Sequence, residues 1–261
     1  MQPDPRCNPT QFYRDVHFVE GQALGERQDD DVLAFPPLEE EDVVFDVDLL
    51  IAEPFYVGHD SMLPWQNLRF WRERTTLNHI LSEDALIIPS KGMLRACAIS
   101  LPDLWKSRCC LNSIEDFDHS VVNATLGACG HLPEQEEGPC LPFSVWQCGE
   151  FDVLSETFDV MEFDFSKLIC ECQGKSQVKF TKRGVCHGFV LWIDWVMDLH
   201  NSIVISTGPD RKYWKQGVKL LRTPRTVGPQ RLRSVQLCCS AVLEACFNPL
   251  KGDLKIILDF L

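Results

Sequence analysis

The sequence predicts an α/β segment followed by a β domain, and three patterns along the chain indicate this fold class. Residues 43–51 form an apolar-rich run that is continuous at its end, as in a strand buried on both faces. An amphipathic stretch follows at residues 61–82. From there to the C-terminus, short strand-like runs recur between glycine and proline, which is typical of a sandwich or barrel.

The amphipathic stretch predicts one helix. Leu68, Trp71 and Leu77 belong to its apolar stripe, and arginines lie between them, so the helix would pack one face on a sheet. Two strands are expected next, at residues 85–89 and 93–101, around a turn that contains Gly92.

The remainder is predicted as β structure with one irregular excursion. Residues 109–142 are rich in glycine, proline and acidic residues and indicate an inserted arm. Further strands are expected at residues 157–165, 177–181, 188–197 and 202–206, and segments 234–245 and 254–261 would close the sheet.

Charge is distributed unevenly along the 261 residues. Lys and Arg total 25 against 38 Asp and Glu, for a net charge of −13. Residues 1–50 hold 13 of the acidic and 3 of the basic residues, so we expect residues 1–42 to form an acidic, loosely ordered segment. The net charge argues against nucleic acid and anionic membranes as partners and favours cationic ones.

Thirteen cysteines scattered over the chain indicate reduced thiols in a cytoplasmic or nuclear protein. The longest apolar stretch, residues 188–197, is interrupted by Asp194 and is far too short to span a bilayer, so we expect no membrane segment. Cys170, Cys172, Cys186 and His187 are nominal zinc ligands, but their spacing differs from that of structural zinc sites, and we expect no metal.

Two loops carry the candidate chemistry. Glu53 and Asp60 follow the first buried strand, and two carboxylates on one loop suit a guanidinium, which donates paired N–H bonds to each of them. The alternative is a pair of solvated loop acids. Tyr213 and Trp214 follow a predicted strand and turn, and the alternative there is a surface turn whose Trp caps the core. The sequence has no glycine-rich turn for a nucleotide cofactor.

These motifs, taken in order, resemble the protein arginine methyltransferases, and in particular the second, C-terminal repeat of the type 7 monomethylating subfamily. The resemblance covers about residues 46–221. It rests on the runs LLIAEPF from Leu49, SMLPWQNLRFW from Ser61, ALIIP from Ala85, LPDLW from Leu101, MEFDF from Met161, STGP from Ser206 and WKQ from Trp214.

The resemblance implies a fold in which residues 43–89 are the C-terminal edge of a Rossmann-like methyltransferase domain. Residues 90–261 would then be a β-barrel domain with an arm-like insertion at about 107–145. It also implies transfer of a methyl group from S-adenosylmethionine to arginine, with Glu53 and Asp60 in the catalytic double-Glu loop and Tyr213 and Trp214 in the substrate-binding Thr-His-Trp loop. Asp60 is one methylene shorter than the family's Glu, and Tyr213 replaces its His, so the repeat is degenerate.

Three functions follow as alternatives. The first is a non-catalytic module that packs on a catalytic repeat or on a second copy and binds no cofactor alone. The second is an arginine methyltransferase that a partner chain completes by supplying the cofactor-binding half, with Arg-rich proteins as substrates. The third is an acidic interaction domain that binds basic proteins through residues 29–42.

Overall fold

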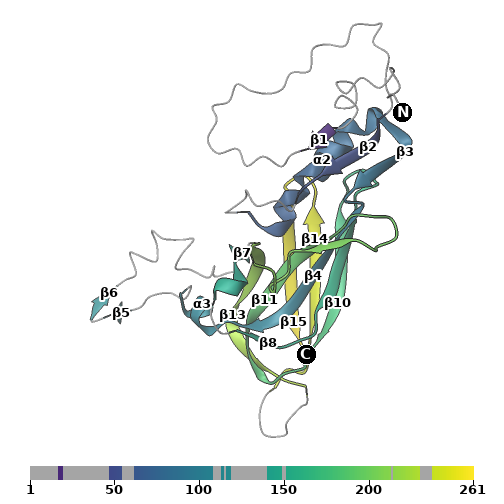
Figure 1. Cartoon of the computed structure of the whole chain (residues 1–261). Coiled ribbons are helices and arrows are strands. Elements are labelled where there is room, and N and C mark those ends of the chain that lie inside the picture. Colours follow the sequence, from purple (N-terminus) through teal and green to yellow (C-terminus); the bar gives the residue numbers. More distant parts are fainter. Residues whose placement is uncertain are drawn as a thin grey trace, which may run out of the picture.

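A small parallel sheet and a short helix lie at one end of a set of long antiparallel strands (Figure 1). The computed structural model describes residues 17–19, 47–54, 62–107, 113–114, 116–118, 140–148, 151–212, 214–229 and 237–261. Most of the predicted acidic segment, residues 1–42, and most of the predicted arm, residues 107–145, lie outside these ranges.

The small sheet has the order β1-β2-β3, and both strand pairs are parallel. Its strands are β1 (His17–Val19), β2 (Val47–Ala52) and β3 (Leu81–Ile88). The predicted run at residues 43–51 is therefore a strand where the structure describes it. β1 was not expected, because its three residues lie within a segment that has no sustained periodicity.

The predicted helix at residues 61–82 is broken into three short pieces, which corrects the expectation of one continuous helix. They are η1 (Pro64–Leu68), α2 (Arg69–Thr76) and η2 (Leu77–His79). Thr75 and Thr76 end the α-helical part, and each hydroxyl donates to the carbonyl four residues earlier, at 2.8 Å and 3.2 Å. Such back-bonding weakens and bends a helix end.

The antiparallel strands form two larger sheets. One has the order β7-β13-β11-β4-β8, with β12 on β11 and β9 on β4, and the other has the order β10-β14-β15. The first sheet contains β4 (Lys91–Ser100), β7 (Cys140–Phe143), β8 (Asp152–Val153), β9 (Phe158–Asp164), β11 (Gly184–Val196), β12 (Val204–Ser206) and β13 (Gln216–Val227). The second contains β10 (Cys172–Lys179), β14 (Ser240–Asn248) and β15 (Asp253–Phe260).

Short elements complete the described part of the chain. The hairpin of β5 (Ser113–Ile114) and β6 (Phe117–Asp118) lies within the region predicted as an arm. The helices α3 (Pro102–Ser107) and η3 (Val145–Gln147) flank that region on either side.

Strand β13 was missed by the sequence analysis, although it pairs with the central strand β11. Its register shifts between Cys186 and Gly188, so that residues 221–224 of β13 lie opposite His187 alone. Pro224 lies in this bulge, where a residue without an N–H is tolerated. Because a proline inside a run argues against a central strand, residues 216–227 did not indicate β13 in the sequence.

The hydrogen bonding of the described strands leaves the predicted barrel open. β15 pairs only with β14, and β7 covers β13 only from Gln216 to Lys219. At one end the two sheets do meet, where Cys238 N donates to Thr226 O and Gly228 N donates to Cys238 O, both at 3.1 Å. The sheets therefore face each other across a seam between β13 and β15.

An aromatic cluster joins α2 to both antiparallel sheets. It consists of Phe70, Trp71, Phe163, Phe165, Trp195 and Phe247, all of them buried. Phe165 lies between rings of the helix and of β11, with centroid distances of 4.6 Å to Phe70, 5.5 Å to Trp71 and 5.8 Å to Trp195. Trp71 stacks on Phe247 at 6.4 Å. Edge-to-face and stacked pairs add stability beyond the area that they bury.

Polar contacts fix the same helix to the loop that follows β9. Trp71 Nε1 donates to Lys167 O at 2.7 Å, and Arg74 donates to Ser166 O at 2.6 Å. Ile169 N donates to Thr75 Oγ1 at 2.8 Å. Both apolar and polar groups therefore hold α2 against the β domain.

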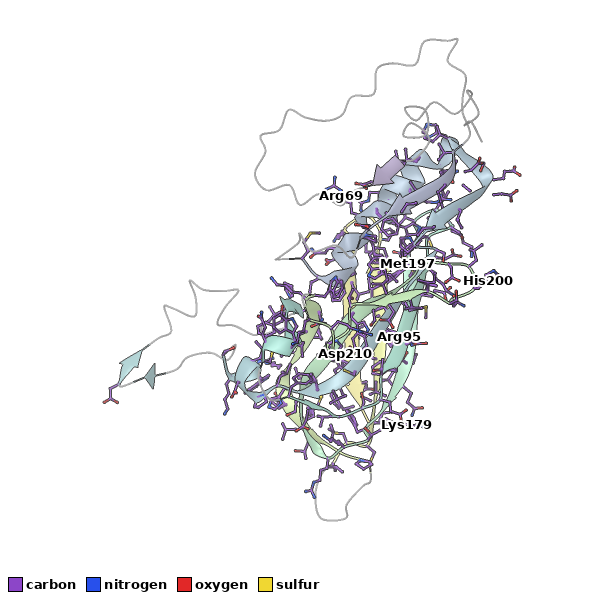
Figure 2. The ribbon with its side chains drawn as sticks, in the orientation of Figure 1. Arg69, Arg95, Lys179, Met197, His200 and Asp210 are labelled. Atoms are coloured by element: carbon purple, nitrogen blue, oxygen red, sulfur yellow. The ribbon has the colours of Figure 1, made fainter. Side chains whose placement is uncertain are left out.

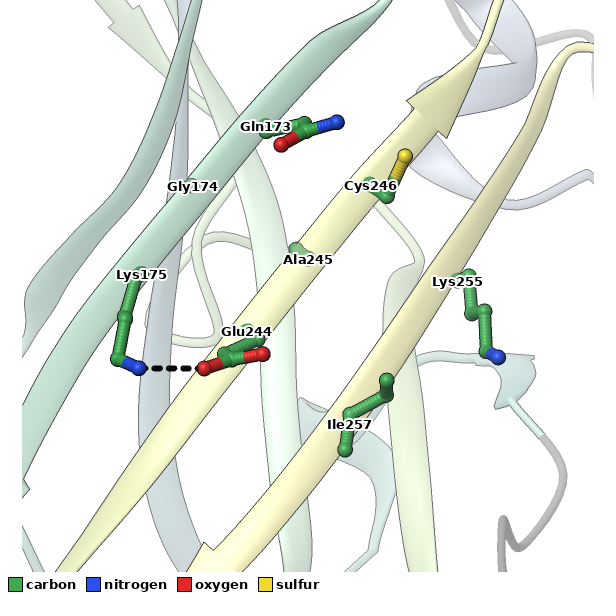
Figure 3. Close-up of a pocket in the computed structure, with 8 residues that line it drawn as sticks. All are labelled: Gln173, Gly174, Lys175, Glu244, Ala245, Cys246, Lys255 and Ile257. Atoms are coloured by element: carbon green, nitrogen blue, oxygen red, sulfur yellow. Dashed lines mark ion pairs between the residues drawn. The ribbon is translucent and has the colours of Figure 1, made fainter.

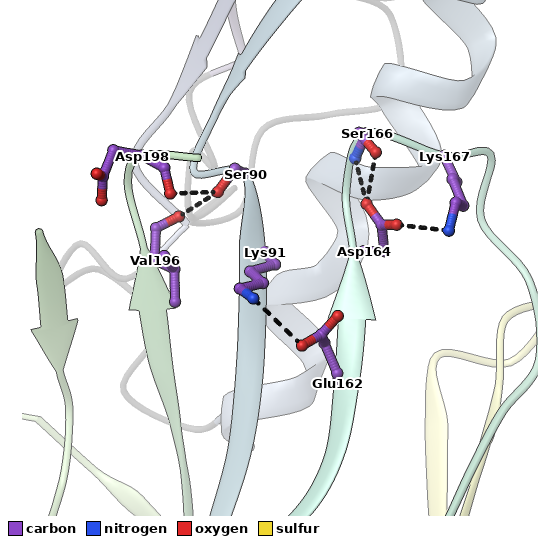
Figure 4. A network of polar contacts seen from close by, with 8 residues as sticks. All are labelled: Ser90, Lys91, Glu162, Asp164, Ser166, Lys167, Val196 and Asp198. Carbon is purple, nitrogen blue, oxygen red and sulfur yellow. Dashed lines mark hydrogen bonds and ion pairs between the residues drawn. The ribbon is translucent and has the colours of Figure 1, made fainter. Parts of the chain in front are cut away.

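The strand ends beneath α2 are tied to one another (Figure 4). Ser90 Oγ donates to Val196 O at 3.1 Å and to Asp198 O at 3.2 Å, which joins the start of β4 to the end of β11. Asp164 accepts hydrogen bonds from Ser166 and forms an ion pair with Lys167 at 2.8 Å. These contacts fix the loop on which α2 packs.

His187 anchors the start of α3 from the opposite face of β11. Its ring is buried and lies 6.1 Å from the ring of Trp105. Leu101 N donates to His187 Nδ1 at 3.2 Å, so this nitrogen must be unprotonated. Burial lowers the pKa of His187, and the neutral ring is the form that stabilises the fold.

Truncation of Trp71 to Ala should lower the free energy of unfolding by about 3 to 5 kcal/mol, because it removes a buried ring that contacts three others. Denaturant unfolding measures this. The matched control is Leu199→Ala at a side chain that is 70% exposed, where we expect a change within about 0.5 kcal/mol. Equal effects at the two positions would show that the cluster does not hold the helix.

Stability should fall as the pH drops below about 6.5, the ordinary pKa of His, because the unfolded chain then takes up a proton that buried His187 does not. One such proton contributes a slope of about 1.4 kcal/mol per pH unit. Unfolding of wild type and His187→Gln at several pH values isolates this slope. The exposed His200, changed to Gln, serves as the control and should leave it unchanged. A wild-type slope retained in His187→Gln would contradict the assignment.

Candidate functional site

Glu53 lies at the carboxyl end of the central strand of the parallel sheet. Ala52 before it and Pro54 after it are buried, whereas Glu53 is exposed. Ligands of parallel sheets bind at this edge, so the placement is suitable for a substrate carboxylate. Residues 55–61 lie outside the described residues, and the pairing of Glu53 with Asp60 stays a prediction.

Trp214 lies two residues before the start of β13 and is half-buried. Tyr213 lies outside the described residues. The turn that precedes the loop is held from below, because Thr207 Oγ1 donates to Ile193 O at 2.9 Å. Gly208 packs on the ring of Trp192, where a Cβ atom would be 3.2 Å from Nε1, and this close approach favours glycine.

Gln216 fixes the Trp214 loop through its side-chain amide. The residue is fully buried, and its Nε2 donates to Thr207 O at 2.9 Å, Gly208 O at 3.1 Å and Trp214 O at 3.2 Å. Its Oε1 accepts from Val145 N at 3.1 Å. One amide therefore joins the turn, the loop and η3. In the sequence, Gln216 stands out only as part of the WKQ motif, because no local pattern indicates that an amide is buried.

A carboxylate lies beside the same turn. Asp194 of β11 accepts from Trp192 Nε1 at 2.9 Å and from Arg95 Nε at 3.1 Å, and its side chain is 15% exposed. Arg95 also forms an ion pair with Asp159. Figure 2 labels Arg95 on β4 and Asp210 in the turn after β12. In the sequence, Asp194 stands out only as an interruption of an apolar run.

A contact between Trp65 and Gly217 joins η1 to the strand that follows Trp214. Trp65 of η1 is 1% exposed, and its ring lies over Gly217 of β13, where a Cβ atom would be 2.6 Å from the ring. Asp60 precedes Trp65 by five residues, which span at most about 18 Å, and Trp214 precedes Gly217 by three. This bound is compatible with an approach of Asp60 to Trp214, which stays a prediction.

The described residues do not form a cradle for S-adenosylmethionine. Two strands of the parallel sheet have described ends: β2 is followed by Glu53 and the buried Pro54, and β3 is followed by Pro89, Ser90 and β4. Neither end is a glycine-rich turn into a helix, the arrangement that binds such cofactors. We therefore derive no chemical step through this cofactor.

The cysteines and histidine considered for zinc lie apart. Neighbouring strand residues point to opposite faces, and accordingly Cys186 packs in the main core while His187 contacts Trp105. Burial raises the pKa of both Cys172 and Cys186 to about 12, so both stay protonated. Within the described ranges, no three His, Cys, Asp or Glu residues are grouped as metal ligands.

Among the helices that the structure describes, none has the length and apolar character needed to cross a membrane.

Comparison with known proteins identifies relatives over most of the chain. The family model described as "Arginine methyltransferase oligomerization subdomain" matches residues 105–243. Protein arginine N-methyltransferase 1.6 of Arabidopsis thaliana is 62% identical over 194 residues, which are 73% of this chain and 27% of that protein. Protein arginine N-methyltransferase 7 of Oryza sativa subsp. indica is 54% identical over 208 residues, which are 80% of this chain and 28% of that protein.

A solved structure shares the fold. The Trypanosoma brucei PRMT1 enzyme-prozyme heterotetrameric complex with AdoHcy matches with a TM-score of 0.55 at 15% identity, over 85% of this chain and 65% of that chain. The chain spans less than a third of the length of the two plant relatives. By its family model and by its identity to these relatives, the chain belongs to the protein arginine N-methyltransferase family.

Proposed function

We propose that this chain is a non-catalytic module of a type 7-like arginine methyltransferase, which packs on a catalytic repeat or on a second copy of itself. The observation that carries this proposal is the match of residues 105–243 to the oligomerization subdomain of the family. The absence of a glycine-rich cofactor turn from the sequence supports it.

The domain organisation that we infer follows the same resemblance. The parallel strands β2 and β3, with α2 between them, would be the edge of a Rossmann-like methyltransferase domain over residues 43–89. The two antiparallel sheets would be the β-barrel domain of residues 90–261, with its seam open. The likeness of fold to the Trypanosoma brucei structure supports this division.

The enzyme–prozyme pairing named for that structure offers an analogy for the role of the chain. In this analogy the chain takes the place of the prozyme. A catalytic repeat would supply the S-adenosylmethionine site, and the arginine substrate would bind there.

A second candidate function is an active methyltransferase that a partner chain completes. One observation favours it, because Glu53 is exposed at the carboxyl end of β2 and remains available to a guanidinium. Asp60 would be the second carboxylate, and Tyr213 and Trp214 would line the substrate site. The contact between Trp65 and Gly217 supports the proximity of these two loops.

In either function Gln216 acts as a positioning residue for the Trp214 loop, because its amide bonds to three loop carbonyls at once. Gln216 would influence a bound substrate by holding Trp214 in place and would not contact the substrate itself.

Titration of the folded chain with S-adenosylmethionine, and with its demethylated product, should give no binding heat. The physical reason is that the residues described by the structure present no row of backbone N–H groups at a glycine-rich turn. Isothermal calorimetry measures this, and circular dichroism of the same sample verifies that it is folded. A family member with a complete cofactor domain is the positive control. Micromolar binding by this chain would overturn the non-catalytic proposal and favour the second function.

Replacement of Gln216 by Leu should lower the free energy of unfolding by at least about 2 kcal/mol, since it leaves three carbonyls and the Val145 N–H without their buried partner. The near-ultraviolet circular dichroism of the tryptophans should change with it. The control is Gln177→Leu on the exposed face of β10, where we expect less than about 0.5 kcal/mol. A Gln216→Leu protein with unchanged stability and spectrum would exclude the positioning role.

A further inference from the structure

Two hollows on the antiparallel sheets stand apart from the candidate site. The first, of about 470 Å³, lies on the outer face of β10, β14 and β15 (Figure 3). Lys175 and Glu244, which both line it, form an ion pair at 2.6 Å, so each of these two charges already has a partner within the chain. The second, of about 400 Å³, is lined by residues of β13 and β15 and is the open seam between the two sheets.

The seam presents backbone groups that can pair with another strand. β15 pairs only with β14 among the described strands, so its other edge faces the seam. Leu261 N donates to Ser240 O at 2.9 Å, and backbone groups alternate in direction along an antiparallel strand. The N–H groups of Ile256, Leu258 and Phe260 therefore point away from β14 and into the seam.

Side chains give the seam an apolar floor. Leu221, Leu258 and Phe260 line it and belong to, or pack against, the main core. Leu258 and Phe260 are nevertheless only half-buried, because no neighbouring strand of the described chain covers them. A strand that entered the seam would bury this apolar surface and would gain stability from it.

Its rim is basic in a chain that is acidic overall. Lys219, Arg222 and Arg225 of β13 line the seam, and the last two are exposed. Residues 211–243 contain eight basic and no acidic residues, against a net charge of −13 for the chain. This rim attracts carboxylates, which arginine binds with paired hydrogen bonds.

We propose that the seam binds an extended acidic segment of a partner protein, which adds a strand beside β15. Its alternate side chains would be apolar toward the floor and acidic toward the arginines of the rim. Backbone hydrogen bonds would supply affinity, and the alternation of side chains would supply specificity, as in other cases of strand addition. This site is separate from the Glu53 and Trp214 loops and does not depend on catalysis.

The test uses a fluorescent peptide of eight residues, the length of β15, with alternating Glu and Val. Fluorescence anisotropy should show saturable binding to the folded chain that weakens as salt is raised. A peptide with Lys in place of Glu should bind at least about tenfold more weakly. The Glu peptide should also bind at least about tenfold more weakly when the alternate amides along the edge that would face β15 are N-methylated. N-methylation removes the N–H groups that the peptide would donate to β15.

The protein variant is Arg222→Glu with Arg225→Glu, which should weaken binding by about tenfold or more. The matched control is Lys179→Glu with Lys251→Glu, which changes the net charge equally at exposed positions outside the lining of the seam. Circular dichroism verifies that both variants fold. Equal loss in both variants would show attraction by net charge alone and would overturn the proposal.

Hydrogen exchange of the wild-type chain gives an independent measurement. Bound peptide should slow exchange of the amides of Ile256, Leu258 and Phe260, and should leave Val242 and Leu243 in the already paired strand β14 unchanged. Absence of peptide binding, or binding without this protection, would overturn strand addition. Tighter binding of a single-stranded oligonucleotide than of the Glu peptide would assign the basic rim to nucleic acid instead.

Discussion

The packing of α2 against the antiparallel strands is the constraint on which the rest of the structure depends. A helix of eight residues is not stable by itself in water, so its existence follows from tertiary contacts. Phe70 and Trp71 supply these contacts by entering a cluster of rings from three different strands or their ends. The parallel sheet connects to the helix on both sides and is therefore fixed relative to the β domain.

The position of the candidate site follows from this packing. Because α2 is fixed, the preceding η1 places Trp65 on Gly217, and the close approach of the ring leaves no room for a larger residue there. Gln216 stands next to Gly217 and fixes the turn and the Trp214 carbonyl. Gly217 of β13 thus contacts the α/β segment through Trp65, and the neighbouring Gln216 fixes the Trp214 loop.

Much of this fold could be predicted from periodicity, and the rest depends on contacts that no local pattern shows. The apolar run of residues 43–51 and the strand expected at residues 157–165 correspond to β2 and β9. The break of the helix at Thr75 depends on a hydroxyl that bonds backward, and β13 was hidden by Pro224. At the site, Glu53 directly follows β2, as its place after the apolar run indicated, whereas Trp214 precedes a strand that was not predicted. The roles of Gln216 and Asp194 arise only from burial, and those of Asp60 and Tyr213 stay predictions.

The open seam has a local cause in the sequence. Residues 221–224 of β13 bulge opposite one residue of β11, and Pro224 within the bulge has no N–H to donate. An irregular edge without that donor is a poor partner for the straight edge of β15, so on this side the described parts of the two sheets are hydrogen-bonded only near Thr226 and Cys238. The same strand carries Lys219, Arg222 and Arg225, a local positive charge that the net charge of −13 does not indicate. Since a partner meets the local field within about a Debye length, roughly 8 Å at physiological salt, the charge of this strand determines what the seam attracts more than the net charge does.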